Sequence, residues 1–281
     1  MDVVYLIKGG HNEELRWSLR SLSNLPHDRV WLFGGKPPEW VQNTEWVKTP
    51  QDDTRYRNTT RAMVAACEHP DVSDPFILMN DDFYILRKTK NIPALNRGTV
   101  EEVLAEYRAQ YPNSDAYVDG MGATLERLRE MGYENPLSYE LHTPLVVDKA
   151  KMLEAIEAGS DLSVIHKRTM YGNLAGLRGR KIEDVKVRSP KDTIPRGTFL
   201  STVEQSFEEV RPVLRYFLGD EMCHYESYIS PTVKTTPLTD PVVLARDVVF
   251  DGAKYLAGCA VRLDVARQMY RAGVLNDERL A

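Results

Sequence analysis

The chain has 281 residues, 42% of them hydrophobic and 27% charged, and a formal net charge of −5 at pH 7. These values are ordinary for a soluble globular protein. A chain of this length buries roughly three quarters of the surface that its unfolded form exposes, so it needs no disulfide or structural metal to fold. The negative balance excludes a nucleic-acid surface built from bulk charge and leaves only a local basic groove for that role.

Cysteine usage and hydrophobic run lengths indicate the compartment. The three cysteines, Cys67, Cys223 and Cys259, are an odd number with no C-x-x-C spacing, which predicts reduced thiols rather than a disulfide framework. The N-terminus lacks the basic region and long apolar stretch of a signal peptide, and no run approaches the ~18 apolar residues of a membrane span. We therefore expect a cytoplasmic protein without a membrane span.

The first 82 residues alternate between short β-branched runs and amphipathic segments. Each apolar run stops at glycines or polar residues, and Leu15, Leu19 and Leu22 recur at near-helical spacing after Asn12. This pattern predicts a parallel or mixed sheet covered by helices. We expect strands at 3–7, 29–33, 44–47 and 75–79, and helices opening at Asn12 and spanning 58–68.

Three polar or glycine clusters follow predicted strands. They are Lys8-Gly9-Gly10-His11, Gly34-Gly35-Lys36 and Asn80-Asp81-Asp82. Ligands of open α/β sheets bind at the carboxyl ends of strands, so these clusters are the first indication of a functional site.

The rest of the chain is more helical. We expect a basic glycine-rich loop at 172–180, and a linker at 231–241 that contains three prolines. This segment divides the chain into a larger domain at 1–230 and a linker with a C-terminal appendage of unknown role at 231–281. Helices are predicted at 99–111, 124–131, 149–158, 207–218 and 261–272, with a strand-like segment at 141–147 and an apolar segment at 242–250.

Asn80-Asp81-Asp82 is the strongest candidate for chemistry. Two adjacent carboxylates at a strand end repel each other unless a cation lies between them, and Mg²⁺ commonly joins carboxylates to substrate phosphates. The motif thus predicts a metal–diphosphate site with Asp81 and Asp82 as ligands. The alternative is a turn that binds no ligand, because Asn and Asp are both favoured in turns.

A histidine and several cations are further candidates. His142 precedes Thr143-Pro144 in an apolar segment and is either structural or a general acid or base. Lys167-Arg168, Arg178, Arg180 and Lys191 could bind phosphate oxygens, although a solvated surface is the stronger interpretation of Arg178 and Arg180. Triads of the serine-hydrolase kind, P-loops, G-x-G-x-x-G and zinc spacings are all missing from the sequence.

Several segments together resemble the Stealth family of sugar-phosphate transferases. Asp2 to Tyr5 and Asn12 to Leu22 are similar to that family's first block, and Val72 to Tyr84 is similar to the second, which ends in N-D-D and aromatics. Leu141 to Lys149, followed by Arg168, resembles a third block of the form H-x-P-x-x-x-x-K, and 199–226 is a poor match to the fourth. The second block also resembles glycosyltransferases of actinobacterial phages. The resemblance covers roughly residues 1–230.

The resemblance implies a GT-A-like nucleotide-sugar fold, a mainly parallel mixed sheet flanked by helices. It implies a divalent cation, Mg²⁺ or Mn²⁺, at Asp81 or Asp82, and catalytic roles for His142, Asp82 and Arg168. Lys8 to His11 stand where the family usually has W-V-x-G. The residues expected to bind the donor are Lys8, Gly9, Gly10, Arg16, Asn58, Arg61 and Asn80.

The expected function is transfer of a sugar or sugar-phosphate from a nucleotide-sugar donor to a hydroxyl of a glycan, a protein or a modified nucleotide. Attack at the β-phosphorus would release a nucleoside monophosphate, and attack at the anomeric carbon would release a nucleoside diphosphate. His142 and Arg168 favour the first, whereas the compact size and the phage resemblance favour the second. The alternative outside catalysis is an inactive nucleotide- or carbohydrate-binding module.

Overall fold

The computed structural model describes residues 1–110, 113, 115–189, 192, 194–195 and 197–227. The predicted appendage at 231–281, with its apolar segment at 242–250 and expected helix at 261–272, lies outside these residues. Within the described part of the chain, no helix combines the length and the apolar character needed to cross a membrane.

A five-stranded sheet forms the centre of the molecule, in the order β3-β2-β1-β4-β7. Neighbouring strands are parallel except β7, which runs antiparallel to β4. The predicted class, a mixed and mainly parallel sheet flanked by helices, is therefore confirmed. The strands are β1 (Val3–Ile7), β2 (Val30–Gly34), β3 (Glu45–Lys48), β4 (Phe76–Met79) and β7 (Leu145–Val147).

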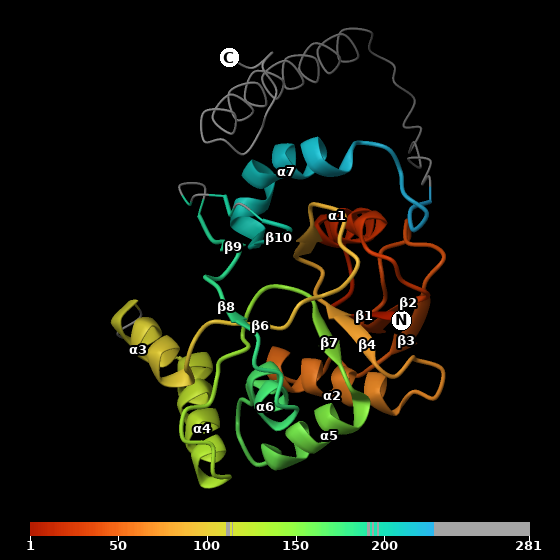
Figure 1. The fold of residues 1–281 in the computed structure, drawn as a ribbon. Coiled ribbons are helices and arrows are strands. Elements are labelled where there is room, and N and C mark those ends of the chain that lie inside the picture. Colours follow the sequence, from red (N-terminus) through yellow and green to blue (C-terminus); the bar gives the residue numbers. More distant parts are fainter. Residues whose placement is uncertain (111–112, 114, 190–191, 193, 196, 228–281) are drawn as a thin grey trace, which may run out of the picture.

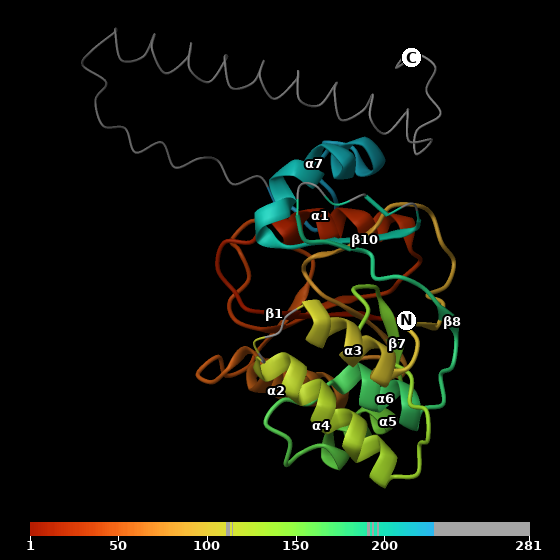
Figure 2. The same ribbon diagram turned by 90° about the vertical axis from the view of Figure 1, so that its left-hand side faces the viewer.

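Helices cover both faces of this sheet, as Figures 1 and 2 show. Because successive strand residues point to opposite faces, Val4 and Leu78 pack into one core while Tyr5 and Met79 pack into the other. On one side lie α1 (Glu13–Ser21) and α7 (Glu204–Leu218), and on the other lie α2 (Arg55–Glu68), α5 (Lys149–Ala158) and α6 (Lys167–Leu174).

Smaller elements complete the described chain. A three-stranded sheet of order β5-β10-β9 packs beside α1 and α7, and a two-stranded sheet joins β6 to β8. The helices α3 and α4 pack against each other, and α4 also contacts α6. Their bounds are β5 (Phe83–Ile85), β6 (Leu95–Asn96), β8 (Arg180–Lys181), β9 (Lys186–Val187), β10 (Phe199–Thr202), α3 (Val100–Gln110), α4 (Ala116–Glu130) and the 3₁₀ helix η1 (Leu22–Asn24).

Two boundaries differ from the sequence prediction because of local capping. Helix α2 begins one turn early, since the Thr54 side chain accepts a hydrogen bond from the Arg57 amide. Helix α4 begins eight residues before the predicted Thr124, because Asp115 accepts from the first free amides of the helix. The segment 172–180 was predicted as a loop, and this is wrong for its first three residues, which belong to α6.

The buried side chain of Asp2 fixes the start of β1. It accepts hydrogen bonds from the Trp31 indole at 2.8 Å, the Ser73 amide at 3.1 Å and the Arg29 amide at 3.2 Å. Burial by itself would raise the pKa of this carboxyl, but the hydrogen bonds to its charged form outweigh burial, and the pKa is lowered. Asp2 thus joins β1, β2 and the loop before β4.

Candidate active site

The chain order of the strands places a natural crevice between β1 and β4. From β1 the chain moves outward to β2 and β3, and it then returns to add β4 on the other side of β1. The loops after β1 and β4 therefore diverge at the carboxyl edge of the sheet, where open α/β sheets bind ligands. Lys8 directly follows β1, and Asn80 directly follows β4.

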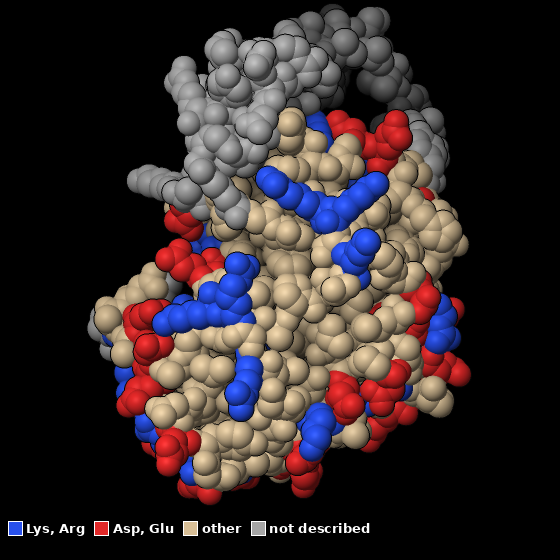
Figure 3. Space-filling model, in the orientation of Figure 1, with Lys and Arg blue, Asp and Glu red and all other residues tan. Residues whose placement is uncertain are grey.

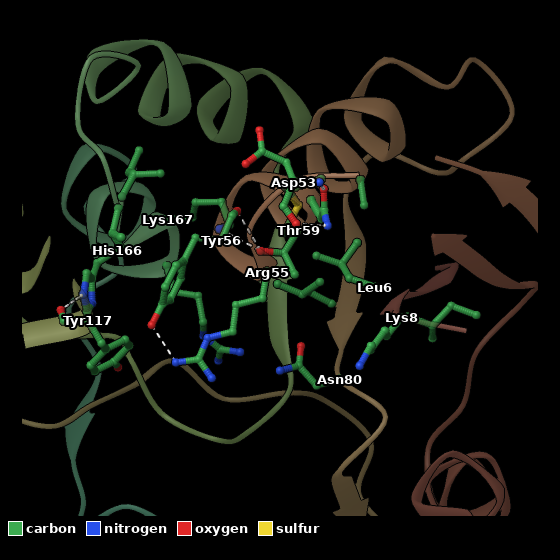
Figure 4. Close-up of a pocket in the computed structure, with 18 of the residues that line it drawn as sticks. Leu6, Lys8, Asp53, Arg55, Tyr56, Thr59, Asn80, Tyr117, His166 and Lys167 are labelled. Carbon is green, nitrogen blue, oxygen red and sulfur yellow. Dashed lines mark hydrogen bonds between the residues drawn. The ribbon is translucent and has the colours of Figure 1, made fainter. Parts of the chain in front are cut away.

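A cavity of about 660 Å³ occupies this crevice. That volume suits a ligand of nucleotide or drug size. Figure 4 shows Lys8 and Asn80 on one side of the cavity, Tyr117 and His166 on the opposite side, and Arg55 reaching between them. Its other polar lining residues are Gln51, Asp53, Tyr56, Asn58, Thr59, Asp81, Glu140, Lys167 and Arg168.

Asp81 brings a partly buried carboxyl to the cavity. Its Oδ2 accepts a hydrogen bond of 2.7 Å from the amide of Asn12, whose Oδ1 also caps α1 by accepting from the Leu15 amide. Burial, followed by repulsion from the nearby carboxylate of Asp82 and then of Glu14, raises the pKa of Asp81 to about 7. A cation at Asp81 would therefore relieve an uncompensated charge.

Asp82 makes a different set of contacts. Its Oδ2 accepts from the Lys186 ammonium at 2.7 Å and from the Ser201 hydroxyl at 3.3 Å, and it does not line the cavity. Lys186 and Ser201 come from β9 and β10, which the β5-β10-β9 sheet brings against the residue before β5. The charge of Asp82 is thus already compensated by a lysine.

The two aspartates therefore fit a divalent cation unequally. Asp81 offers one carboxylate to the cavity, which suits Mg²⁺ when phosphate and water supply the remaining ligands. Asp82 would first have to release Lys186. Among the residues that the structure describes, no group of three or more His, Cys, Asp or Glu side chains could hold a metal by itself. The sequence prediction of a site shared by both aspartates fits Asp81 alone.

His142 forms a dyad with Asp184. Its Nδ1 lies 2.8 Å from Oδ2 of Asp184, and its backbone amide donates to the same carboxylate at 3.1 Å. Burial alone would raise the pKa of Asp184, but hydrogen bonds and charge from His142 and Arg188 outweigh it and hold the pKa well below its usual value. When the ring is neutral and its Nδ1–H donates to this carboxylate, Nε2 is an acceptor, as a general base requires.

Arg168 lies next to this dyad and lines the cavity. Its Nε donates to the Tyr139 carbonyl at 3.1 Å and its Nη2 donates to the Thr143 carbonyl at 2.6 Å. The ring of Phe83 faces both groups, with its centroid 5.7 Å from the Arg168 Cζ and 6.0 Å from the His142 ring centroid. The structure thus places His142 and Arg168 beside Phe83, the residue that follows Asp82, but of the three predicted catalytic residues only Arg168 lines the cavity.

Lys167 adds a second cation at the start of α6. Its Nζ donates to the hydroxyls of Thr59 and Thr60 at 3.3 and 3.1 Å, and no salt bridge to a carboxylate is formed in the described structure. Burial lowers the pKa of Lys167 to about 8, with the charge of Glu140 opposing the shift. A bound anion would favour the charged form of this lysine.

Some residues predicted to bind the donor have structural partners instead. Arg16 stacks on Trp40 and pairs with Glu13 and Glu226 away from the cavity. Arg61 pairs with Asp52 and Asp53 and lines a separate pocket of about 260 Å³. The structure therefore does not place Arg16 or Arg61 in the lining of the larger cavity, where they were predicted to bind the donor.

The glycines and Asn58 shape the surrounding loops. A Cβ on Gly9, whose φ is +88°, would lie 2.8 Å from the backbone of Gly35, so Gly9 lets the loops after β1 and β2 touch. Gly10, also at positive φ, donates its amide to the Lys36 carbonyl at 3.0 Å. The Asn58 side chain lines the cavity and exchanges two hydrogen bonds with the backbone of Asp53.

Four residues in or beside the site were not predicted from the sequence: Asp184, Lys186, Glu140 and His166. Asp184 and Lys186 act through pairings that span 42 and 104 positions of sequence, so no local pattern connects them with His142 and Asp82. Glu140 and His166 carried one available signal, because each directly neighbours a predicted segment, the first next to 141–147 and the second next to Lys167-Arg168.

The surface seen in Figure 1 gives no sign of a second, nucleic-acid site. In Figure 3 the middle of this face is mostly uncharged, and its lysines and arginines lie in small separate groups. Among the described residues on this face, no continuous basic strip follows a path that a nucleic-acid backbone could take.

The fold and the cavity together define an α/β protein with a ligand site at the carboxyl edge of its central sheet. No family model matches the sequence, and no curated protein matches it. The Stealth resemblance therefore stays a prediction.

Among solved structures, similar chains include glycosyltransferases. The galactosyltransferase LgtC, in complex with donor and acceptor sugar analogs, is 10% identical with a TM-score of 0.39 over 83% of this chain and 88% of that one. An active-site mutant of LgtC is 12% identical, with a TM-score of 0.34 over 82% and 87% of the two chains. Mouse xyloside xylosyltransferase 1, in its apo form, is 8% identical, with a TM-score of 0.30 over 80% and 96%. Similarity at this level establishes no activity.

Proposed function

We propose that this protein is a transferase that moves a glycosyl unit from a nucleotide-sugar to a hydroxyl acceptor. The observation that carries the proposal is the cavity of about 660 Å³ at the β1–β4 crevice, which combines cations that form no salt bridge within the described structure with the partly buried carboxyl of Asp81. A nucleotide-sugar is an elongated dianion of suitable size with an apolar base, a diphosphate and a polar sugar. The acceptor, whether glycan, protein or modified nucleotide, stays open.

The cations of the cavity support binding of the diphosphate. Lys8 is exposed at the end of β1, and Arg55, at the start of α2, reaches into the middle of the same cavity. Fixed positive charges that face a leaving diphosphate stabilise the charge that develops on it as the bond to the sugar breaks. Tyr56 and the apolar side chains of Leu6 and Ile165 offer surface for the base.

A divalent cation, Mg²⁺ or Mn²⁺, would be held by Asp81 together with the ligand's own phosphate oxygens. When bound, it would neutralise part of the diphosphate charge. This role for Asp81 also accounts for a carboxyl that is partly buried without a cationic partner in the described structure.

His142 is the proposed general base. Its Nε2 takes the proton of the acceptor hydroxyl as that oxygen bonds to the anomeric carbon, while the bond from the anomeric carbon to the diphosphate breaks and a nucleoside diphosphate leaves. Asp184 fixes the ring tautomer and stabilises the imidazolium that forms, and Arg168 lies beside it at Phe83.

A second reaction has its own supporting observation. The His142–Asp184 dyad and Arg168 lie together, as the resemblance to sugar-phosphate transferases would require. In that reaction the acceptor oxygen attacks the β-phosphorus, the bridging phosphate bond breaks, and a nucleoside monophosphate leaves.

The identity of the released nucleotide tests the proposal. The protein is incubated with Mg²⁺ or Mn²⁺ and a panel of UDP-, GDP- and dTDP-linked hexoses, and the products are identified by mass. We expect a nucleoside diphosphate from at least one donor, and a loss of release on the order of a hundredfold or more in His142→Gln. Lys151→Met, on the surface of α5, is the matched control and should leave the rate unchanged.

Other outcomes decide between the alternatives. A nucleoside monophosphate would replace glycosyl transfer by sugar-phosphate transfer. Binding of a nucleotide-sugar without release of any product would leave the inactive binding module, and neither binding nor release would contradict the proposal.

A further inference from the structure

Two buried polar atoms at one end of the cavity have no hydrogen-bond partner within the described structure. They are Nδ1 of His166 and Nη1 of Arg168. The His166 side chain is 1% exposed, and its Nε2 lies 2.9 Å from the Tyr117 carbonyl, which can only accept. In its neutral form the ring must therefore donate from Nε2, which leaves Nδ1 as an acceptor without a partner among the described residues. Because buried polar atoms are seldom left unpaired, these two indicate a missing ligand.

A carboxylate completes this end of the cavity. Oε1 of Glu140 lies 3.9 Å from Nδ1 of His166, too far for a hydrogen bond, and accepts the Thr169 amide at 3.1 Å. Glu140, His166 and Arg168 all line the cavity, together with the Lys167 ammonium. The end thus presents two acceptors, the carboxylate and Nδ1, and two donors, the guanidinium and the ammonium.

The combination of hydrogen-bond donors and acceptors at this end indicates which class of ligand can bind there. A phosphate carries acceptors only, so the carboxylate and Nδ1 would repel it, and an apolar group would leave all four protein groups unpaired. A sugar hydroxyl both donates and accepts, and neighbouring hydroxyls on one ring can satisfy donors and acceptors in alternation. The ring of Tyr117, whose centroid lies 4.5 Å from that of His166, adds an apolar surface beside them.

We infer that Glu140, His166 and Arg168 form the subsite that binds the hydroxyl groups of the donor's sugar, and that Glu140 and His166 determine which sugar is accepted. The inference rests on the proposed function and deepens it. In Figure 4 Tyr117 and His166 lie across the cavity from Lys8 and Asn80, so the sugar would lie at the α4–α6 side and the diphosphate at the β1–β4 side.

Two conservative variants separate sugar binding from nucleotide binding. Glu140→Gln keeps an oxygen for the Thr169 amide, and His166→Gln keeps a donor for the Tyr117 carbonyl while removing the acceptor Nδ1. Titration calorimetry compares UDP with UDP-glucose and UDP-galactose, and GDP with GDP-mannose. Both variants should weaken the preferred nucleotide-sugar tenfold or more and change the matching nucleoside diphosphate less than twofold. Glu154→Gln, on the surface of α5, is the control.

Equal weakening of nucleotide and nucleotide-sugar binding, or no change in either, would overturn the inference. If both variants fail to fold, Tyr117→Phe and Arg168→Lys replace them. Unchanged sugar binding in these two variants would then overturn it. If the wild type binds no nucleotide at all, the proposed function fails, and free glucose, galactose and mannose at millimolar concentration become the probes in saturation-transfer NMR. Monosaccharide binding that Glu140→Gln abolishes would then sustain the subsite, and its absence would overturn the subsite as well.

Discussion

At the scale of single residues, the two neighbouring aspartates have opposite electrostatic situations. Both are partly buried, but Asp81 has an amide partner, whereas Asp82 is paired with a lysine. The sequence motif gives both residues the same apparent role, because adjacency in sequence does not reveal which long-range partner each one meets. Lys186 is 104 positions from Asp82, and only the folded β5-β10-β9 sheet brings them together.

Replacing Asp81 by Asn should stabilise the protein at pH 8. The pKa of Asp81 is raised to about 7 from an ordinary 3.8, so the folded state binds more protons than the unfolded state between these values and loses stability as pH rises from 4 to 7. We expect Asp81→Asn to raise the melting temperature by several degrees at pH 8, in the absence of divalent cations, and to change it little near pH 4. An equal shift at both pH values would contradict this assignment.

Removing the Lys186 ammonium should destabilise the fold. Lys186 and Asp82 are 15% and 14% exposed, so Lys186→Met leaves a largely buried carboxylate without its cation and should cost about 2–4 kcal/mol in the free energy of unfolding. Urea unfolding measures this change. The double variant with Asp82→Asn should recover at least half of the loss, and an additive further loss would show that the pair is not coupled.

At the scale of elements, the sequence predicts what local pattern controls. The strands β1, β2 and β4 follow from β-branched runs ended by breakers, and α5 follows from its helical spacing. The strands β9 and β10 are only two and four residues long, and they form by pairing with strands distant in the sequence, so no local pattern predicts them. Local pattern therefore predicts a ligand site at the carboxyl ends of the strands. It does not predict Glu140 and His166, which also line the cavity.

Asn12 connects an element boundary to the site. Its Oδ1 caps α1 and its Nδ2 donates to Asp81, so Asn12→Ala should cost about 1–2 kcal/mol in the free energy of unfolding. Asn12→Ser keeps a capping oxygen and should retain most of this stability. Both variants remove the amide donor, and both should weaken binding of a divalent cation and nucleotide if Asp81 serves there. Equal stability loss in the two variants would refute the capping role.

At the scale of the whole molecule, the last described residues return to α1. The carboxylate of Glu226 accepts from Arg20 at 2.6 Å and from Arg16 at 2.8 Å, and its backbone bridges to Val41 near β3. Burial alone would raise the pKa of Glu226, but hydrogen bonds from Arg20 and then Arg16 outweigh it and lower the pKa to about 2. One residue thus joins the end of the described chain to the first helix.

Glu226→Gln should therefore lower stability in a pH-dependent way. The depressed pKa contributes stability that is complete above the unfolded value near 4.5 and is lost as pH falls toward 2. We expect a loss of about 2–3 kcal/mol at pH 7 and a smaller loss at pH 3, measured by urea unfolding. A loss of the same size at both pH values would instead indicate a packing defect.

The most direct test of the whole account is equilibrium binding of nucleotide-sugars to the cavity. Calorimetry with the UDP-, GDP- and dTDP-hexose panel is carried out on the wild type, on Lys167→Met in the cavity and on Lys151→Met on the surface of α5. We predict that one donor class binds the wild type and Lys151→Met equally, and binds Lys167→Met at least tenfold more weakly. Binding that is indifferent to Lys167, or no binding of any nucleotide-sugar, would contradict the account.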